Sequence, residues 1–300
     1  MAEITSQMVK ELREKSGAGM MDCKKALGEA EGDMAKAMNL LRERGAAIAS
    51  KRSSRAAKEG MIAAYITPDR KTGALAELNC ESDFVARNDD FQAMVATLAK
   101  HTAGVANLAE MMASKLEGAA ESLEETIKTA IGKIGENIVF SRWARLKAGE
   151  EGKPAGLIYH YIHPPGKIGV LVDVATSNDS LAKDPAFEEF ARDIAMHIAA
   201  SSPICVRRAE VPSGALDNEK EIFRKQALNE GKPEKIVEKI IEGRLQKYYA
   251  EVCLLEQPFA KNPDLKVEEY MKQNAGKFGD VSVTRFVRYR LGETAEAAAE

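Results

Sequence analysis

Phe84 and Val85 form an apolar pair inside the polar segment NCESDFVARNDDF, which spans residues 79–91. Asn88 is placed to cap a helix that follows, so the pair belongs to a connection between a strand and a helix. An aromatic side chain in such a connection either folds back onto its own helices or anchors in the pocket of a partner. The spacing alone leaves both alternatives open.

Met20 and Met21 raise the same question in the segment SGAGMMD, residues 16–22, which joins two expected helices. Methionine side chains adapt to irregular surfaces and are common at binding faces. A small helical module also uses methionine to fill its core, and the composition does not separate these two alternatives.

Catalytic chemistry has less support than binding. His160 and His163 are three residues apart on an expected strand, which places them on opposite faces and argues against a shared metal ion. We find no phosphate-binding loop, dinucleotide fingerprint, nucleophile elbow or His-Glu-x-x-His motif. No acid, base and nucleophile converge in the sequence, so we expect neither an enzyme nor a bound cofactor or metal.

The composition limits the class of protein further. The 300 residues are long enough for about two domains, and 43 basic residues against 46 acidic ones leave no excess that calls for a nucleic acid. The chain has no signal peptide and no apolar run of about 18 residues that would span a membrane, so we expect a cytoplasmic protein without membrane contact. The four cysteines are far apart in the sequence, which favours reduced thiols over a disulfide framework.

The sequence pattern of residues 1–50 predicts a domain of three short helices. We expect Gly17 to end the first helix, Asp22 to cap the second, and Asp33 to cap the third, which would end at Gly45.

The composition of residues 51–60 is typical of a short polar linker. The linker contains four basic residues, Lys51, Arg52, Arg55 and Lys58. Their side chains either stay solvated or contact phosphates. The alternative function is therefore a helical scaffold or an RNA-associated protein that uses this linker.

Two expected β-hairpins share one pattern at an offset of 96 residues, because Tyr65 aligns with Tyr161 (161 − 65 = 96). The identities continue into the helix after each hairpin, as far as His101 and His197, so we expect these histidines to pack rather than to react. Such an internal duplication implies two α/β subdomains built on one plan.

The fold class is therefore α+β, with core subdomains at 61–150 and 151–293 and a tail at 294–300. Helices are expected at 89–104, 108–118 and 122–138, and an edge strand at 281–293. Phe84 aligns with Ser180 in the second copy, so the shared scaffold does not require an aromatic side chain at this position. That difference favours an outward use of Phe84.

Two segments, LREKSGAGMMDCKKAL (12–27) and ELNCESDFVARND (77–89), resemble the two signatures of the bacterial elongation factor Ts family. The similarity extends over nearly the whole chain and includes IGENIVFSRWARL (134–146) and GKPEKIVEKIIEGRLQKY (231–248). Ser16 and Ser82 stand where the family usually has threonine, and both keep the hydroxyl group.

The resemblance implies a guanine-nucleotide exchange factor for elongation factor Tu, without bond-making chemistry and without direct nucleotide binding. It also implies an N-terminal helical domain like the ubiquitin-associated domain, followed by a two-part core with a helical hairpin inserted at about 200–228.

By the same resemblance, the loop that intrudes beside the magnesium site of elongation factor Tu consists of Ser82, Asp83, Phe84 and Val85. Phe84 would wedge into an apolar pocket of that GTPase, and Asp83 would disturb the polar network around the magnesium ligands.

Further contacts implied by the resemblance would dock the N-terminal domain on the GTPase domain through Gly17, Ala18, Gly19, Met20 and Met21. His163 would lie near the region of the core that meets another domain of elongation factor Tu.

Overall fold

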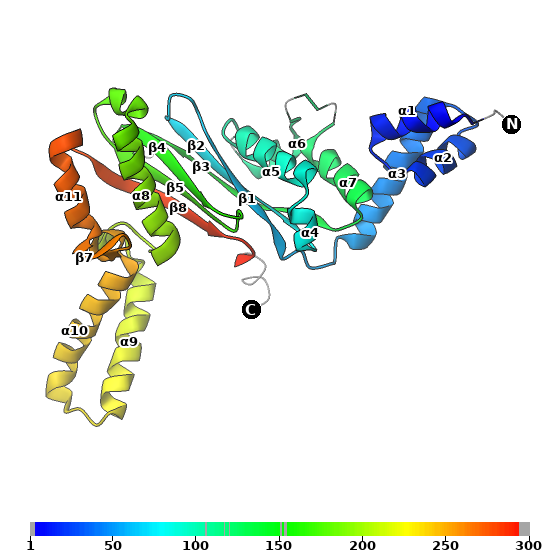
Figure 1. Ribbon diagram of the computed structural model, residues 1–300. Helices are drawn as coiled ribbons and strands as arrows, with labels where there is room; N and C mark the ends of the chain where they lie inside the picture. Colours follow the sequence, from blue (N-terminus) through cyan, green and yellow to red (C-terminus); the bar gives the residue numbers. More distant parts are fainter. Residues whose placement is uncertain are drawn as a thin grey trace. The chain divides into compact units, whose positions relative to one another are not determined.

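The computed structural model combines helices with small sheets, consistent with an α+β protein (Figure 1). It describes residues 4–105, 107–116, 118–119, 121–150, 152 and 155–293, so the expected tail at 294–300 lies outside the described residues. The chain divides into two compact units. Unit 1 consists of Met1–Ala63, Ala76–Trp143 and Leu291–Glu300, and unit 2 consists of Ala64–Leu75 and Ala144–Arg290.

Three helices open unit 1, and they are α1 (Ser6–Ser16), α2 (Met20–Glu29) and α3 (Met34–Arg52). Their shared core buries Leu12, Cys23 and Leu27 completely. Gly17 ends α1 in the left-handed conformation with φ of 67°, as predicted, and the Asp33 carboxylate caps α3 by accepting from the N–H groups of Ala35 and Lys36.

Two of the expected helix ends in this bundle are wrong. Helix α2 begins at Met20 with Gly19 as its N-cap, so Asp22 lies inside the first turn and does not cap the helix. Helix α3 does not end at Gly45 but continues to Arg52, and β1 starts at Glu59. The irregular stretch between them is therefore shorter than the expected linker at 51–60.

Gly45 stays helical because α3 packs against α7 (Leu123–Ile134) at this point. A Cβ atom added to Gly132 of α7 would lie 2.7 Å from the Cα atom of Gly45, which is closer than real Cβ contacts. The two glycines thus allow a close approach of the helix backbones, and this contact outweighs the weak helix propensity of glycine.

The first expected hairpin is confirmed as β1 (Glu59–Ile66) and β2 (Thr72–Cys80). A third strand, β3 (Ile138–Lys147), adjoins β2 in the order β1-β2-β3, and it was not predicted from the sequence. The three expected helices between β2 and β3 are present as α5 (Asp89–Thr102), α6 (Leu108–Ala113) and α7, which ends at Ile134 rather than at 138.

The second sheet lies in unit 2 and has the order β4-β5-β8, with β4 (Gly156–His163), β5 (Ile168–Ala175) and β8 (Ser282–Arg290). All pairs are antiparallel, with Tyr161 opposite Val170 and Val172 opposite Phe286, so the predicted edge strand is confirmed as β8. The smaller elements of the unit are η1 (Asp179–Lys183), η2 (Arg208–Glu210), η3 (Leu254–Glu256), β6 (Pro258–Phe259) and β7 (Asn262–Lys266).

Helix α8 (Pro185–Ser201) packs on β4 and β5 (Figure 1). Helix α11 (Val267–Phe278) contacts α8 through aromatic side chains. The rings of Phe187 and Phe278 meet edge to face with centroids 5.1 Å apart, which is a favourable aromatic geometry.

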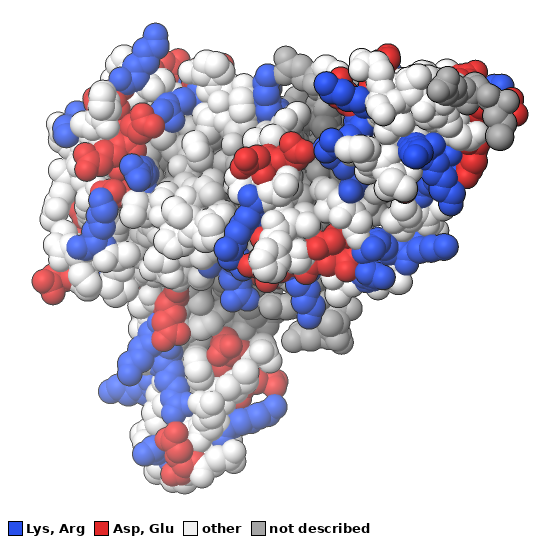
Figure 2. Space-filling model, turned by 45° about the vertical axis from the view of Figure 1, so that its right-hand side comes forward, with Lys and Arg blue, Asp and Glu red and all other residues white. Residues whose placement is uncertain are grey.

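A long helical hairpin projects from unit 2 and consists of α9 (Ser213–Asn229) and α10 (Glu234–Val252) (Figure 1). It therefore lies over 213–252 and not at the expected 200–228, because α8 continues to Ser201 and a loop follows it. Basic and acidic side chains are interspersed over the face of the hairpin that Figure 2 shows. Within the described part of the chain, no helix combines the length and apolar character that crossing a membrane requires.

Each central strand carries a buried carboxylate that an arginine on the neighbouring strand binds. In unit 1, Arg142 donates through Nε to Glu77 at 2.7 Å. In unit 2, Arg285 donates through Nε to Asp173 at 3.2 Å. Both carboxylates are fully buried, so these pairs satisfy charges that would otherwise be costly to bury.

His197 is buried in unit 2 and packs, as predicted, rather than facing solvent. Its Nδ1 accepts from the N–H group of Ala260 at 3.1 Å, and its Nε2 lies 2.9 Å from Oε1 of Gln257. Burial lowers the pKa of this imidazole, because protonation would place a charge in the core and remove the acceptor for Ala260.

Replacing Gly132 with alanine should force α3 and α7 apart. We expect Gly132→Ala to lower the free energy of unfolding by about 1–2 kcal/mol, because overpacking outweighs the gain in helix propensity. A Cβ atom on Gly45 would make only ordinary contacts at 3.9 Å, so Gly45→Ala should be neutral or stabilise by up to about 1 kcal/mol. Urea unfolding measures the free energy of unfolding of both variants. Equal changes in this free energy for Gly132→Ala and Gly45→Ala would contradict the close packing of α3 on α7.

Stability should fall as the pH drops below the ordinary pKa of histidine, near 6.5, because the unfolded chain then binds a proton that folded His197 resists. We expect His197→Gln to flatten the decline in the free energy of unfolding between about pH 7.5 and 5.5. A His197→Gln profile that parallels the wild type would refute this assignment.

Candidate functional site

The turn after β2 exposes Phe84. Ser82 caps the short helix α4 (Asp83–Ala86) by accepting from the N–H group of Val85, and Asn88 caps α5 as predicted. The Phe84 side chain is 82 % exposed, so it does not fold back onto its own helices. An aromatic ring this exposed carries a large unfavourable contact with water in the isolated protein.

The carboxylate of Glu136 holds this turn from the segment that leads into β3. Its Oε2 accepts from the backbone N–H groups of Glu81 at 3.1 Å and Ser82 at 2.9 Å. Its Oε1 accepts from the Ser82 hydroxyl at 2.6 Å. Three hydrogen bonds to one charged acceptor fix the backbone immediately before Phe84.

Glu81 makes the reciprocal contact. Its carboxylate accepts from the N–H group of Asn137 at 2.7 Å, and this bond is the largest cause that lowers the pKa of Glu81. Arg52 and Arg55 each lie 3.4 Å from the same carboxylate. Two of the four basic residues of the expected linker therefore face Glu81.

Asp83 and Val85 complete the turn. Asp83 forms an ion pair with Arg87, one helical turn later, with 2.8 Å between Oδ2 and the guanidinium nitrogen. Both Asp83 and Val85 are partly exposed, so the turn offers a carboxylate and an aliphatic side chain on either side of Phe84.

A second exposed apolar surface follows the α1–α2 turn. Met20 and Met21 occupy the first turn of α2 and are 59 % and 75 % exposed. They precede Cys23, where the buried stripe of α2 begins, so they do not fill the core of the bundle. Gly17 supplies the left-handed turn, and Ser16 Oγ accepts from the N–H group of Ala18 at 3.2 Å.

Lys133 of α7 contacts residues next to both exposed apolar surfaces, Gly17 beside the methionine turn and Asp90 in the helix that follows the Phe84 turn. Its side chain lies so close to Gly17 that an added Cβ atom there would be 3.1 Å from Lys133 Cε. Its ammonium group forms an ion pair of 2.9 Å with Asp90 in the first turn of α5. A groove of about 530 Å³ runs along the same region, and Ala18, Gly19, Leu41, Ile48 and Lys133 are among the residues that line it.

His163 lies in unit 2 at the end of β4, so it does not share a unit with the two apolar surfaces. Its side chain is exposed, and its Nδ1 lies 2.9 Å from the hydroxyl oxygen of Tyr161.

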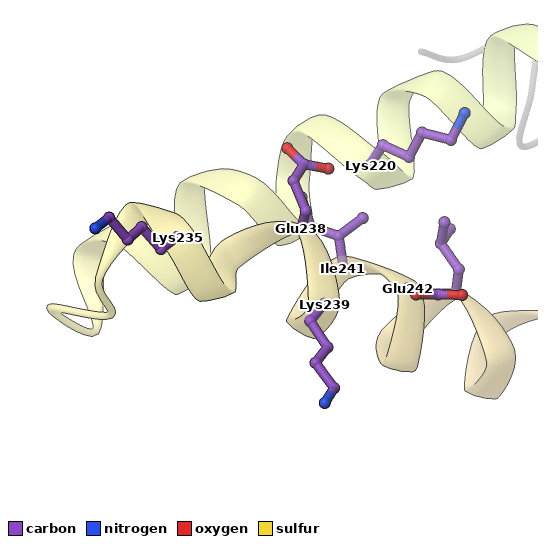
Figure 3. Close-up of a pocket in the computed structure, with 7 residues that line it drawn as sticks. Lys220, Lys235, Glu238, Lys239, Ile241 and Glu242 are labelled. Carbon is purple, nitrogen blue, oxygen red and sulfur yellow. The ribbon is translucent and has the colours of Figure 1, made fainter.

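The helical hairpin carries an open hollow between α9 and α10 (Figure 3). Figure 3 shows the side chains of Lys220, Lys235 and Lys239 pointing in different directions, so they form no common anion site. Among the described residues, no three histidine, cysteine or acidic side chains gather in a way that would hold a metal ion.

Phe84 was predicted from the sequence, but Glu136 and Lys133 were not. Glu136 acts on residues 54 and 55 positions earlier in the chain, and no local pattern reports a contact over that separation. Lys133 has the ordinary appearance of a basic residue in the last turn of a helix.

The chain is similar to known proteins over most of its length. The family model described as "Elongation factor TS" matches residues 81–293. A protein of Prosthecochloris aestuarii named elongation factor Ts is 50% identical over 297 residues, which is 97% of this chain and 100% of that protein. A protein of Clostridium botulinum with the same name is 46% identical and covers 99% of this chain and 96% of its own length. The chain belongs to the elongation factor Ts family.

Proposed function

We propose that this protein is the guanine-nucleotide exchange factor of elongation factor Tu and acts in the cytoplasm during translation elongation. Membership of the elongation factor Ts family supports this function. The observation that carries the proposal is Phe84, an aromatic side chain that is 82 % exposed on a backbone fixed by Glu136.

In the proposed mechanism, Phe84 inserts into an apolar pocket of elongation factor Tu beside its magnesium site. Asp83 then competes in the polar network that orders the magnesium ligands, and Ser82 and Val85 complete the contact. Magnesium requires nearly ideal octahedral geometry, so a small displacement of its ligands weakens both the ion and the bound GDP.

The exchange factor needs no contact with the nucleotide. It must bind nucleotide-free elongation factor Tu more tightly than the GDP-bound form, and linkage then makes the effect reciprocal. The factor weakens GDP binding, GDP weakens factor binding, and GTP can enter once GDP has left.

The exposed turn at 17–21 is proposed to dock the N-terminal domain on the GTPase domain, with Met20 and Met21 as adaptable contacts. His163 is proposed as a separate contact with another domain of elongation factor Tu. Its side chain is exposed at the end of β4, where a partner can approach the ring on the side away from Tyr161.

We also propose that the core arose by duplication and that residues 1–50 form a domain like the ubiquitin-associated domain. The order of hairpin, short helical turn and long helix occurs twice, first as β1-β2-α4-α5 and then as β4-β5-η1-α8. The proposed domains are 1–50, the subdomains 61–150 and 151–293, and the tail 294–300, while the linker expected at 51–60 is reduced to residues 53–58 between α3 and β1.

Phe84→Ala should reduce the acceleration of GDP release from elongation factor Tu at least about ten-fold, which corresponds to a loss of about 1.4 kcal/mol. The reason is that the variant removes the anchor while leaving the turn in place. Stopped-flow release of a fluorescent GDP analogue, with wild type and variant compared, measures this effect.

Leu108→Ala is the matched control, because Leu108 is also an exposed apolar side chain of unit 1, on α6. It should release GDP as fast as wild type. If Phe84→Ala also matches wild type, Phe84 is not the anchor, and if wild type itself fails to accelerate release, the proposed function is wrong.

Glu136→Ala should slow GDP release although Glu136 itself is not proposed to touch the partner. The variant removes three hydrogen bonds that position the turn, so we expect activity between that of wild type and Phe84→Ala. Glu136→Gln keeps one acceptor oxygen and should restore part of the rate.

The control for this variant is Glu124→Ala, which removes a carboxylate that pairs with Lys128 within α7. It should leave GDP release unchanged. A Glu136→Ala protein that is folded by circular dichroism and fully active would show that the turn does not need this support.

A further inference from the structure

Two cysteines that are 48 positions apart in the sequence meet inside unit 2. The Sγ atoms of Cys205 and Cys253 are 3.7 Å apart, and both residues are buried. Val211 is buried beside them, and Tyr248 and Val252 pack against the same cluster. The four cysteines are far apart in the sequence, which favoured reduced thiols over a disulfide framework, but the fold brings this pair of thiols into contact.

The backbone around the pair is held in register at the base of the helical hairpin. Cys205 and Cys253 form a parallel β-bridge, in which the N–H group of Ile204 donates to Val252 at 3.0 Å and the N–H group of Leu254 donates to Cys205 at 2.9 Å. Backbones paired in this way lie about 4.8 Å apart, within the range of Cα separations that disulfides span.

We propose that Cys205 and Cys253 are a redox-active dithiol whose disulfide closes the base of the α9–α10 hairpin. The bond would join the chain just before η2 to the end of α10, so the whole hairpin would become a covalently closed loop. The two sulfur atoms already lie in contact, and the β-bridge holds the backbones of Cys205 and Cys253 at a separation that a disulfide can span.

The co-reactant is a low-molecular-weight disulfide. The Cys205 thiolate attacks one sulfur of that disulfide, forms a mixed disulfide and releases one small thiolate, which takes up a proton. The Cys253 thiolate then attacks the Cys205 sulfur and releases the second small thiol. The protein loses two protons and two electrons, and the small disulfide gains both as it becomes two thiols.

Cys205 is the first nucleophile because it is the less buried of the two thiols. Burial raises the pKa of Cys253 to about 12 and also raises the pKa of Cys205. The thiolates are therefore scarce at neutral pH, and oxidation should be slow there and faster at higher pH.

The full-length protein, reduced and then equilibrated with mixtures of oxidised and reduced glutathione, tests the proposal. After acid quenching and alkylation, mass spectrometry should show the loss of two alkylation sites and of two hydrogen atoms. The cross-linked peptide should contain Cys205 and Cys253, and excess reduced dithiothreitol should reverse the change.

A Cys23→Ser/Cys80→Ser variant, which retains only the proposed pair, should oxidise as wild type does. Cys205→Ser should abolish the intramolecular disulfide. If both thiols stay alkylatable in the most oxidising mixture, or if either pairs with Cys23, Cys80 or a second chain, the proposal is overturned. The wild-type measurement stands even where a serine variant fails to fold.

Discussion

The exposure of the Phe84 ring depends on a turn whose backbone is held in place. An exposed aromatic ring gains free energy if its turn rearranges and buries it, so the turn must be held against that tendency. The carboxylate of Glu136 provides this restraint by accepting three hydrogen bonds from Glu81 and Ser82. Glu81 returns the contact to Asn137, so two neighbouring segments fix each other at the point where β2 ends and β3 is about to begin.

The two sheets use a similar principle in their interiors. Glu77 and Asp173 hold equivalent positions in the two hairpins, since 173 − 77 = 96, and each is bound by an arginine from the next strand. A buried ion pair adds little net stability compared with apolar packing, but breaking it by removing one partner typically costs about 3–5 kcal/mol. The pairs therefore penalise any shift of β3 or β8 along its neighbour.

Local patterns predicted the parts of the fold that depend on local physics. Asp33 and Asn88 cap their helices because a short polar side chain binds free N–H groups wherever a helix begins. The hairpins and the edge strand β8 followed from alternation and turn residues. Gly45 was wrongly expected to end α3, because its helical state depends on contact with Gly132, which is 87 residues away (132 − 45 = 87).

Local sequence patterns could not predict the long-range contacts, because these contacts join residues that are far apart in the chain. The sequence identified Phe84 as an aromatic residue without a counterpart in the repeat, but it could not decide whether the ring faces outward. Neither Glu136 nor the thiol contact of Cys205 and Cys253 leaves a periodic signal, because each joins segments about 50 residues apart. Strand β3 was missed although its residues are β-like, because a helix pattern leads directly into it.

The unbroken course of α3 has a consequence for recognition. Its residues Leu41 and Ile48 line the groove beside Ala18 and Gly19, and Arg52 at its end lies 3.4 Å from Glu81 in the Phe84 turn. One continuous helix therefore connects the surroundings of the two exposed apolar surfaces, with no flexible joint between residues 41 and 52. Under the proposed function, a partner that contacts both surfaces must match the spacing that this helix sets.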